Sequence, residues 1–299
     1  MLFDITHQTD YAFSRPVYLE PHTLRFHPRS DGAQWLESYE LSITPEPQGL
    51  THMLDAEGNT VAVAWFDGLH DRLSISARIQ AQTLRENPFD FLLDSPRPAV
   101  PCSYPESLGW LLAPARHRKI QRCDADPIHD FVTQLRRQSD DVLSFLTALN
   151  QALYNGIEVI HREIGEPRDP AETLTTRRGA CRDLAMLFVD ACRAMGLAAR
   201  FVSGYQEGDR DQTQRELHAW AEVYLPGAGW RGFDPTHGLA VSDRHLVLAA
   251  ASDPKDAAPV VGHFRGNEAT STMTARITVH VAESITTPPQ NRQQQQQTA

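Results

Sequence analysis

The sequence predicts an α+β protein in which an N-terminal β-sandwich precedes a domain with a central helix packed on an antiparallel sheet. Three observations predict this fold. Residues 1–85 contain short runs of alternating apolar and polar side chains, residues 181–195 contain an apolar stripe at helical spacing, and residues 198–234 return to strand-like runs. Alternation buries one face of a strand, and a 3.6-residue period buries one face of a helix. Hairpins packed on a helix then give an antiparallel α+β core.

Residues 1–85 are expected to form the sandwich. Their apolar-alternating runs are separated by turn sequences such as Asp31-Gly32, Glu57-Gly58-Asn59 and Asp67-Gly68. Short strands at this spacing are typical of a sandwich. The scattered histidines of this region are expected to be surface or strand-packing residues rather than metal ligands; they are His7, His22, His27, His52 and His70.

Residues 86–125 are expected to form a connector. Its prolines are predicted to exclude regular helix and central strand; they include Pro88, Pro96, Pro98, Pro101 and Pro105. The connector is too apolar for a free linker, so it is expected to lie against one or both domains; its apolar residues are Phe89, Phe91, Leu92 and Leu93.

The second domain is expected to span residues 126–285 and to begin with helices. One helical face is shared by Ile128, Phe131, Val132 and Leu135. Ser139 is the expected N-cap of a second amphipathic helix that ends near Asn155-Gly156. Asp169-Pro170 has the sequence of a helix start, an N-cap followed by proline. The Gln-rich residues 286–299 are expected to be disordered.

The central helix is predicted over residues 181–195. Its apolar positions recur at i, i+3, i+4, i+7, i+8 and i+11, and Gly196 supplies a residue suited to end it. Strands are expected at residues 198–205, 217–225 and 230–234. Further strand candidates of this domain are residues 245–250 and 274–283.

Composition argues against several classes of protein. The net charge of −10 over 299 residues disfavours nonspecific binding to nucleic acid or an anionic membrane. No apolar run reaches the roughly 20 residues of a membrane span, and residues 1–7 lack the pattern of a signal peptide. None of the 4 cysteines forms a C-x-x-C pair or fits a zinc template. Reduced thiols in the cytoplasm, without metal or cofactor, are therefore expected.

Cys181 is the candidate nucleophile because it lies in the first turn of the central helix. A thiol attacks as its thiolate, and the helix dipole and free N–H groups favour that anion. Arg177, Arg178 and Arg182 add positive charge, and Gly179 is expected to permit a tight turn and the approach of a substrate. Asp183 is expected to cap the helix or to order Arg182.

His218 and Asp234 are the candidate partners of Cys181. They lie on consecutive expected strands, so an antiparallel sheet brings their side chains together. Histidine would act as the base and aspartate would hold its tautomer. Trp220 is assigned either to the wall of a substrate cleft or to packing in the sheet. His237 and His245 are expected to have structural roles, His237 by capping or packing the turn after Asp234.

Four motifs resemble the bacterial transglutaminase-like superfamily in order and spacing; they are Gly179–Asp183, Ala198–Tyr205, His218–Tyr224 and Gly229–Thr236. The opening, Thr6–Tyr11 with Leu24–Pro28, is similar to the N-terminal region that accompanies this domain in bacteria. The resemblance implies a transglutaminase-like, papain-like catalytic domain with a Cys-His-Asp triad of Cys181, His218 and Asp234.

The same resemblance implies acyl transfer from a peptide or glutamine-type amide to water or to an amine. A cysteine protease or amidase is the first expectation. Protein crosslinking by a protein-glutamine gamma-glutamyltransferase and a non-catalytic protein-binding module are the alternatives. A protein or peptide is the expected partner, and the oligomeric state is left open. Tyr154 and Asn150 are candidates to complete the oxyanion hole, and Tyr154 is also assigned to substrate binding.

Overall fold

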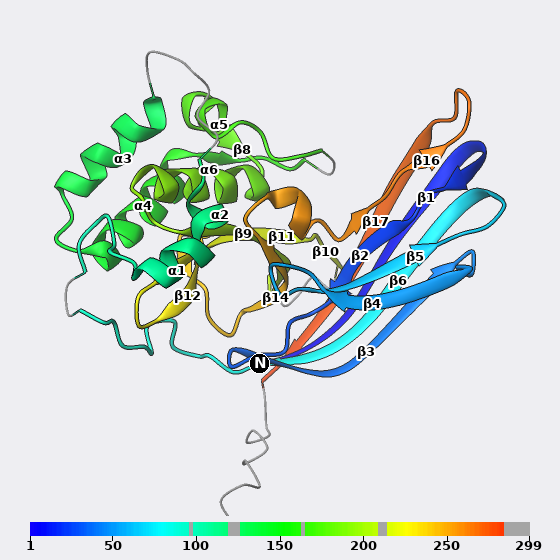
Figure 1. Ribbon diagram of the computed structural model, residues 1–299, viewed down its shortest axis with the longest axis horizontal. Coiled ribbons are helices and arrows are strands. Elements are labelled where there is room, and N and C mark those ends of the chain that lie inside the picture. Colours follow the sequence, from blue (N-terminus) through cyan, green and yellow to red (C-terminus); the bar gives the residue numbers. More distant parts are fainter. Residues whose placement is uncertain (96–97, 119–125, 163–164, 209–213, 284–299) are drawn as a thin grey trace, which may run out of the picture.

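The protein has two lobes, a long β lobe and a lobe of helices covering one sheet (Figure 1). The computed structural model describes residues 1–95, 98–118, 126–162, 165–208 and 214–283. The tail predicted at residues 286–299 lies outside these residues. No helix among them is long and apolar enough to cross a membrane.

The β lobe is a sandwich of two antiparallel sheets, as the sequence predicts. The larger sheet has the order β10-β17-β1-β6-β3, with β16 also paired to β1. Its strands are β1 (Leu2–Leu19), β3 (Gln34–Thr44), β6 (Leu69–Thr83), β10 (Gln214–Arg215), β16 (Phe264–Arg265) and β17 (Ser271–Ala282). The smaller sheet has the order β15-β2-β5-β4. Its strands are β2 (His22–His27), β4 (Gly49–Leu54), β5 (Thr60–Trp65) and β15 (Val260–Val261).

Strand β17 corrects the expectation that residues 274–283 belong with the second domain. It runs antiparallel to β1, with Leu2 opposite Ala282 and Phe13 opposite Ser271. Ile277 and Val279 are buried in the core of the sandwich. The alternating pattern identifies a strand but not its partner, because pairing over such a sequence distance depends on which sheet offers a free edge.

The predicted connector contains two short helices, α1 (Glu106–Leu111) and α2 (Ala113–Arg116). The expectation that its prolines exclude helix is therefore wrong at this point. Pro105 immediately precedes α1, and Pro114 lies in the first turn of α2. Proline is tolerated there because the first N–H groups of a helix have no intrahelical acceptor.

The second lobe places helices over a five-stranded antiparallel sheet of order β13-β12-β11-β9-β14. The strands are β9 (Ala199–Gln206), β11 (His218–Leu225), β12 (Gly229–Asp234), β13 (Leu239–Ala240) and β14 (His245–Ala251). The helices are α3 (Pro127–Arg137), α4 (Val142–Gly156), α5 (Pro170–Thr176), α6 (Cys181–Ala194) and the 3-10 turn η1 (Pro254–Ala257). Strands β7 (Glu158–Val159) and β8 (Arg178–Gly179) form a small parallel ladder. The predicted α+β architecture is confirmed.

Helix α6 is the central helix that the apolar stripe predicts. Leu184, Leu187 and Phe188 are fully buried against the sheet, where Phe188 stacks on Phe233 with ring centroids 5.5 Å apart. Gly196, with φ +74, follows its C-cap as expected.

The start of α4 differs from the expectation that Ser139 is its N-cap. The N-cap is Asp141, whose carboxylate accepts the Ser144 N–H at 2.8 Å, while the Ser144 hydroxyl accepts the Asp141 N–H at 3.0 Å. This reciprocal pair satisfies two free donors, whereas Ser139 donates its hydroxyl to the Leu135 carbonyl.

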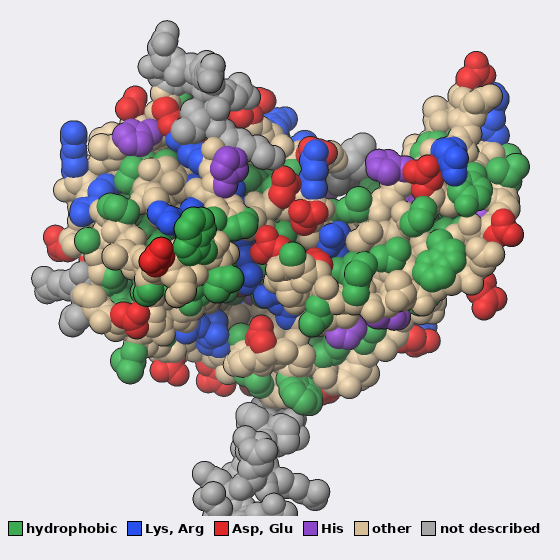
Figure 2. All heavy atoms as spheres, in the orientation of Figure 1, with side chains coloured by type: hydrophobic (Ala, Val, Ile, Leu, Met, Phe, Trp, Pro, Cys, Tyr) green, Lys and Arg blue, Asp and Glu red, His purple; other side chains and the backbone are tan. Residues whose placement is uncertain are grey.

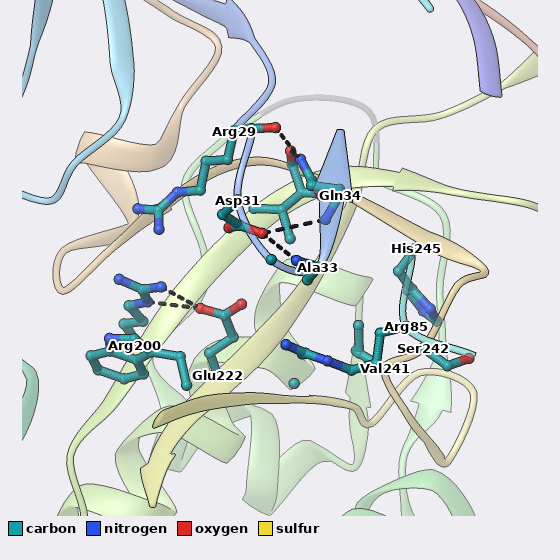
Figure 3. A pocket seen from close by; sticks show the side chains of 14 residues that line it. Arg29, Asp31, Ala33, Gln34, Arg85, Arg200, Glu222, Val241, Ser242 and His245 are labelled. Carbon is teal, nitrogen blue, oxygen red and sulfur yellow. Dashed lines mark hydrogen bonds and ion pairs between the residues drawn. The ribbon is translucent and has the colours of Figure 1, made fainter. Parts of the chain in front are cut away.

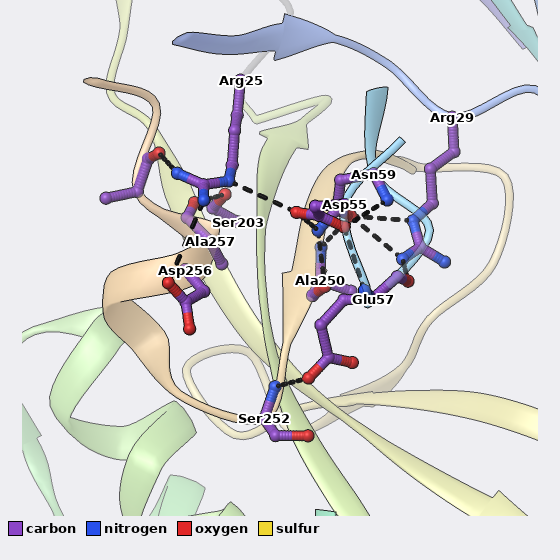
Figure 4. Close-up of polar contacts among 11 residues, drawn as sticks. Arg25, Arg29, Asp55, Glu57, Asn59, Ser203, Ala250, Ser252, Asp256 and Ala257 are labelled. Atoms are coloured by element: carbon purple, nitrogen blue, oxygen red, sulfur yellow. Dashed lines mark hydrogen bonds and ion pairs between the residues drawn. The ribbon is translucent and has the colours of Figure 1, made fainter. Parts of the chain in front are cut away.

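Strand β14 is an edge strand of its sheet, and side chains of the β lobe take the place of a missing neighbour. The Gln34 amide bonds both the N–H and the C=O of Val247, each at 2.8 Å. The Asn59 amide bonds both backbone groups of Ala250, at 2.9 and 3.0 Å (Figure 4). These contacts satisfy backbone groups that an edge strand otherwise leaves open, and they fix the second lobe against the first.

The two lobes also share one apolar core. Tyr205, Leu246 and Leu248 of the second lobe close the end of the sandwich core. The Tyr205 hydroxyl lies 2.9 Å from Nδ1 of His7, and burial lowers the pKa of His7 to about 4. Figure 2 shows the lobes separated by a notch at the upper edge, with acidic and basic side chains interspersed over this face.

Candidate active site

Cys181 is the first residue of α6, and the backbone before it packs closely. Gly179 is buried, and a Cβ built on it would lie 2.9 to 3.0 Å from side-chain atoms of Thr173, Asp183 and Leu184. Glycine is therefore needed here for packing beneath the helix start. The expected tight turn is not the reason, because the Gly179 backbone does not have a positive φ.

Asp183 is fully buried and anchors this helix start. Its Oδ2 accepts the Ala180 N–H at 2.8 Å, and its Oδ1 accepts the Arg168 N–H at 2.8 Å. The Arg162 guanidinium forms an ion pair with Oδ1 at 2.5 Å. Helix capping, one of the two expected roles, is observed. Arg162 is the cation bonded to the carboxylate, and Asp183 also interacts with Arg182 by its charge.

The arginines expected near Cys181 have different partners. Arg178 forms an exposed ion pair with Glu158 at 2.8 Å. Arg182 interacts with Cys181 by its charge, and burial together with the nearby Arg162 lowers the pKa of Arg182. Arg162 is the basic residue that the sequence analysis missed, because only the fold brings it to Asp183.

His218 and Asp234 meet as the sequence predicts, because β11 and β12 are adjacent and antiparallel. His218 Nε2 donates to Asp234 Oδ2 at 2.8 Å. Cys181 also interacts with the His218 imidazole, and this interaction favours the charged ring. Burial alone would lower the pKa of His218, but the charge and hydrogen bond of Asp234 and the contact with Cys181 together raise it to about 10.

Asp234 is fully buried, and it accepts hydrogen bonds from three imidazoles. Oδ2 lies 2.8 Å from His218 Nε2, 2.8 Å from His237 Nδ1 and 3.1 Å from His245 Nε2. Oδ1 accepts the Thr236 N–H at 2.9 Å. Burial opposes ionisation, but the charge of His218 and the three histidine hydrogen bonds hold the pKa of Asp234 well below its usual range.

His237 and His245 both bond the Asp234 carboxylate. The sequence placed His237 at the turn after Asp234, but it gave no indication that His245 reaches the same carboxylate. His237 lies three residues after Asp234 and is partly exposed. This short spacing in the sequence indicates that the two side chains can lie close together. His245 comes from β14 and is buried, and burial lowers its pKa, so the ring is neutral at pH 7. Ligand atoms of His218, Asp234 and His245 lie within 4.8 Å of one another, close enough to hold a metal ion.

The two residues assigned to substrate binding lie in different environments. Trp220 is completely buried and packs with Val202 and Ala250, so it offers no surface to a substrate. Packing in the sheet, the alternative role, is the one observed. Tyr154 is 47% exposed, and its ring covers Gly238 beside His237.

Asn150, the other candidate for the oxyanion hole, is buried. Its amide donates to the Leu239 carbonyl at 3.1 Å. This bond ties α4 to β13 and uses an amide donor that an oxyanion would need.

The chain is similar to known proteins over both lobes. Residues 3–82 match the bacterial transglutaminase-like N-terminal region, and residues 129–235 match the transglutaminase-like superfamily. An uncharacterized protein of Mycobacterium tuberculosis is 26% identical over 93% of this chain and 92% of its own length. A protein-glutamine gamma-glutamyltransferase of Pseudomonas aeruginosa is 38% identical over 87 residues, 26% of this chain and 13% of that protein.

A solved structure from Cytophaga hutchinsonii, described as a candidate cysteine protease, has the same fold. It superposes with a TM-score of 0.68 at 23% sequence identity and covers 95% of this chain and 92% of its own. Both lobes therefore have a counterpart in one protein. This chain therefore joins a bacterial transglutaminase-like N-terminal region, residues 3–82, to a transglutaminase-like core domain, residues 129–235.

Proposed function

We propose that the protein is a cysteine hydrolase, a protease or amidase that cleaves peptide or glutamine-type amide bonds. One arrangement carries the proposal: His218 is bonded to the buried Asp234 at 2.8 Å and also interacts with Cys181 at the start of α6. Nucleophile, base and orienting carboxylate in this order are what acyl transfer through a thioester requires.

In the first half of the proposed reaction, the Cys181 thiolate attacks the carbonyl carbon of the amide and forms a C–S bond. The backbone N–H of Cys181, at the positive end of α6, stabilises the oxyanion. Collapse of the tetrahedral intermediate breaks the C–N bond. The His218 imidazolium, favoured by its raised pKa, gives its proton to the leaving amine.

In the second half, neutral His218 takes a proton from water, which attacks the thioester. The C–S bond breaks, the acid product leaves, and the thiolate and imidazolium are restored. Asp234 keeps the imidazole oriented throughout, because its bond to Nε2 leaves Nδ1 directed to the reacting groups. A free thiol nucleophile suits a reducing compartment, so we propose that the enzyme acts in the cytoplasm on a protein or peptide.

Crosslinking is the second candidate, because the Pseudomonas aeruginosa relative is a protein-glutamine gamma-glutamyltransferase. In that reaction a primary amine replaces water in the second half. A glutamine peptide incubated with a labelled amine distinguishes the two, since hydrolysis releases ammonia without incorporating label. Incorporation of the amine faster than hydrolysis would overturn our preference.

Alkylation tests the nucleophile and distinguishes an enzyme from a non-catalytic binding module. In a Cys123→Ser background, iodoacetamide should modify Cys181 well below pH 8. Cys102 and Cys192 serve as internal controls, because burial raises the pKa of Cys102 to about 11 and that of Cys192 well above its usual range. Cys181→Ala should abolish amide cleavage and leave the melting temperature nearly unchanged. An inert Cys181 in the folded protein would refute the mechanism.

A further inference from the structure

A cavity of about 210 Å³ lies between the two lobes, on the side of the sheet away from α6 (Figure 3). The loop between β2 and β3 forms one wall, and strands β9, β11, β12 and β14 form the other. Five charged side chains are part of its lining. They are Arg29, Arg85 and Arg200 with Asp31 and Glu222.

The three guanidinium groups differ in how many of their nitrogens donate hydrogen bonds to the protein. Arg29 uses Nε and Nη2 on Asn59 and the Glu57 carbonyl, which leaves Nη1. Arg200 uses Nε and Nη2 on the Glu222 carboxylate, which also leaves Nη1. Arg85 is partly buried and makes no hydrogen bond or ion pair with any residue that the structure describes.

The cavity is therefore short of negative charge. Three guanidinium groups face two carboxylates, and both carboxylates are already engaged. Asp31 accepts the Ala33 N–H at 2.7 Å, and Glu222 pairs with Arg200 at 2.6 Å. Burial and the charge of nearby Arg200 lower the pKa of Arg29. Two positive charges therefore lie close together in a place that is partly shielded from water.

We propose that this cavity binds a small oxyanion, either a phosphate or the carboxylate group of a small acid. The Arg85 guanidinium would bind two of its oxygens, and Arg29 and Arg200 add positive charge to the same cavity. Planar guanidinium forks match phosphate and carboxylate oxygens in pairs. The volume is below the roughly 300 to 1,000 Å³ of sites for drug-sized ligands, so the ligand is small.

The site is distinct from the proposed nucleophile but adjoins the triad. His245 lines the cavity and donates Nε2 to Asp234, and its buried Nδ1 has no partner within the described chain. Cys181 does not line the cavity. The proposal therefore does not depend on catalysis, and Cys181→Ala should bind the anion with unchanged affinity.

Calorimetric titration with inorganic phosphate and with succinate, at constant ionic strength in chloride, tests the proposal on the full chain. At least one anion should bind with 1:1 stoichiometry and raise the melting temperature as the site saturates. Binding of phosphate alone identifies a phosphoryl ligand, and binding of succinate alone identifies a carboxylate. Binding of neither would overturn the proposal.

Arg85→Gln is the decisive variant, because Arg85 has no described protein partner to lose. We expect its melting temperature without anion to match the wild type and its anion affinity to fall about tenfold to a hundredfold. Arg78→Gln is the matched control, since Arg78 is exposed on β6 and its removal changes the net charge equally. Equal binding by the Arg85→Gln protein, or an equal loss in both variants, would show adventitious binding and overturn the site.

Discussion

Two buried carboxylates flank the candidate active site, and their partners differ in kind. Asp183 is held by Arg162 and by backbone N–H groups of Ala180 and Arg168. Asp234 is held mainly by imidazoles. An arginine and amides keep their protons at all working pH values, so Asp183 can only fix geometry. Imidazoles gain and lose protons, so Asp234 can influence a reaction that moves a proton.

Asp234→Asn should have the largest effect in this comparison. The amide removes the negative charge that favours the His218 imidazolium. Its N–H₂ group can also donate to Nε2 of His218, which favours the tautomer that lacks a proton on Nε2. We expect the second-order rate constant for amide cleavage to fall by about 1,000-fold or more, with the fold retained. Steady-state kinetics and circular dichroism measure the two effects. Full activity in this variant would remove Asp234 from the triad.

The pH dependence of the unfolding free energy tests how the imidazole of His218 and the carboxylate of Asp234 depend on each other. The raised pKa of His218 contributes stability that is complete below about pH 6.5 and is lost as pH rises towards 10. The depressed pKa of Asp234 contributes stability that is present above about pH 3.8 and is lost as pH falls further. Urea titrations across pH measure both limbs. Asp234→Asn should remove most of the alkaline loss, and an unchanged alkaline limb would contradict the assigned cause.

Asp183→Asn should affect stability rather than chemistry. The variant leaves the partly buried Arg162 without its counter-charge and weakens the cap of α6. Breaking such a pair costs about 3 kcal/mol of unfolding free energy. Urea denaturation measures this loss, and the turnover number per folded molecule should stay near that of the wild type. A stable but inactive variant would mean that Asp183 takes part in catalysis.

The sequence predicts the parts of this site that depend on local chemistry. The stripe of α6 places Cys181 at a helix start, and two consecutive strands bring His218 beside Asp234. Long-range pairing is not encoded in such patterns. β17 has the alternation of any half-buried strand, yet it returns to β1. His245 reaches Asp234 only because β14 lies beyond β9, where Gln34 and Asn59 bind its open edge.

His245→Leu tests the buried member of the three histidines. Leucine removes a hydrogen bond to a charged carboxylate, a contact worth about 1.5 to 3 kcal/mol. If that bond orients Asp234 in the transition state, the turnover number should fall about tenfold or more while KM stays constant. His245→Gln keeps a donor and should restore most of the rate. Equal losses in both variants would indicate a packing role instead.

His237→Gln should have the smallest effect, because the His237 side chain is 42% exposed. Its hydrogen bond to Asp234 has the same 2.8 Å length as that of His218, but water can replace it, and exposed charged contacts contribute only about 0.2 to 1 kcal/mol. We expect the turnover number to fall by less than about fivefold, because the buried His245 bond still holds the carboxylate. A loss as large as that of His245→Leu would mean that burial does not decide how much each histidine contributes to turnover. The exposed ring would then have to act on the substrate directly. Tyr154, whose ring covers the neighbouring Gly238, would lie beside that substrate.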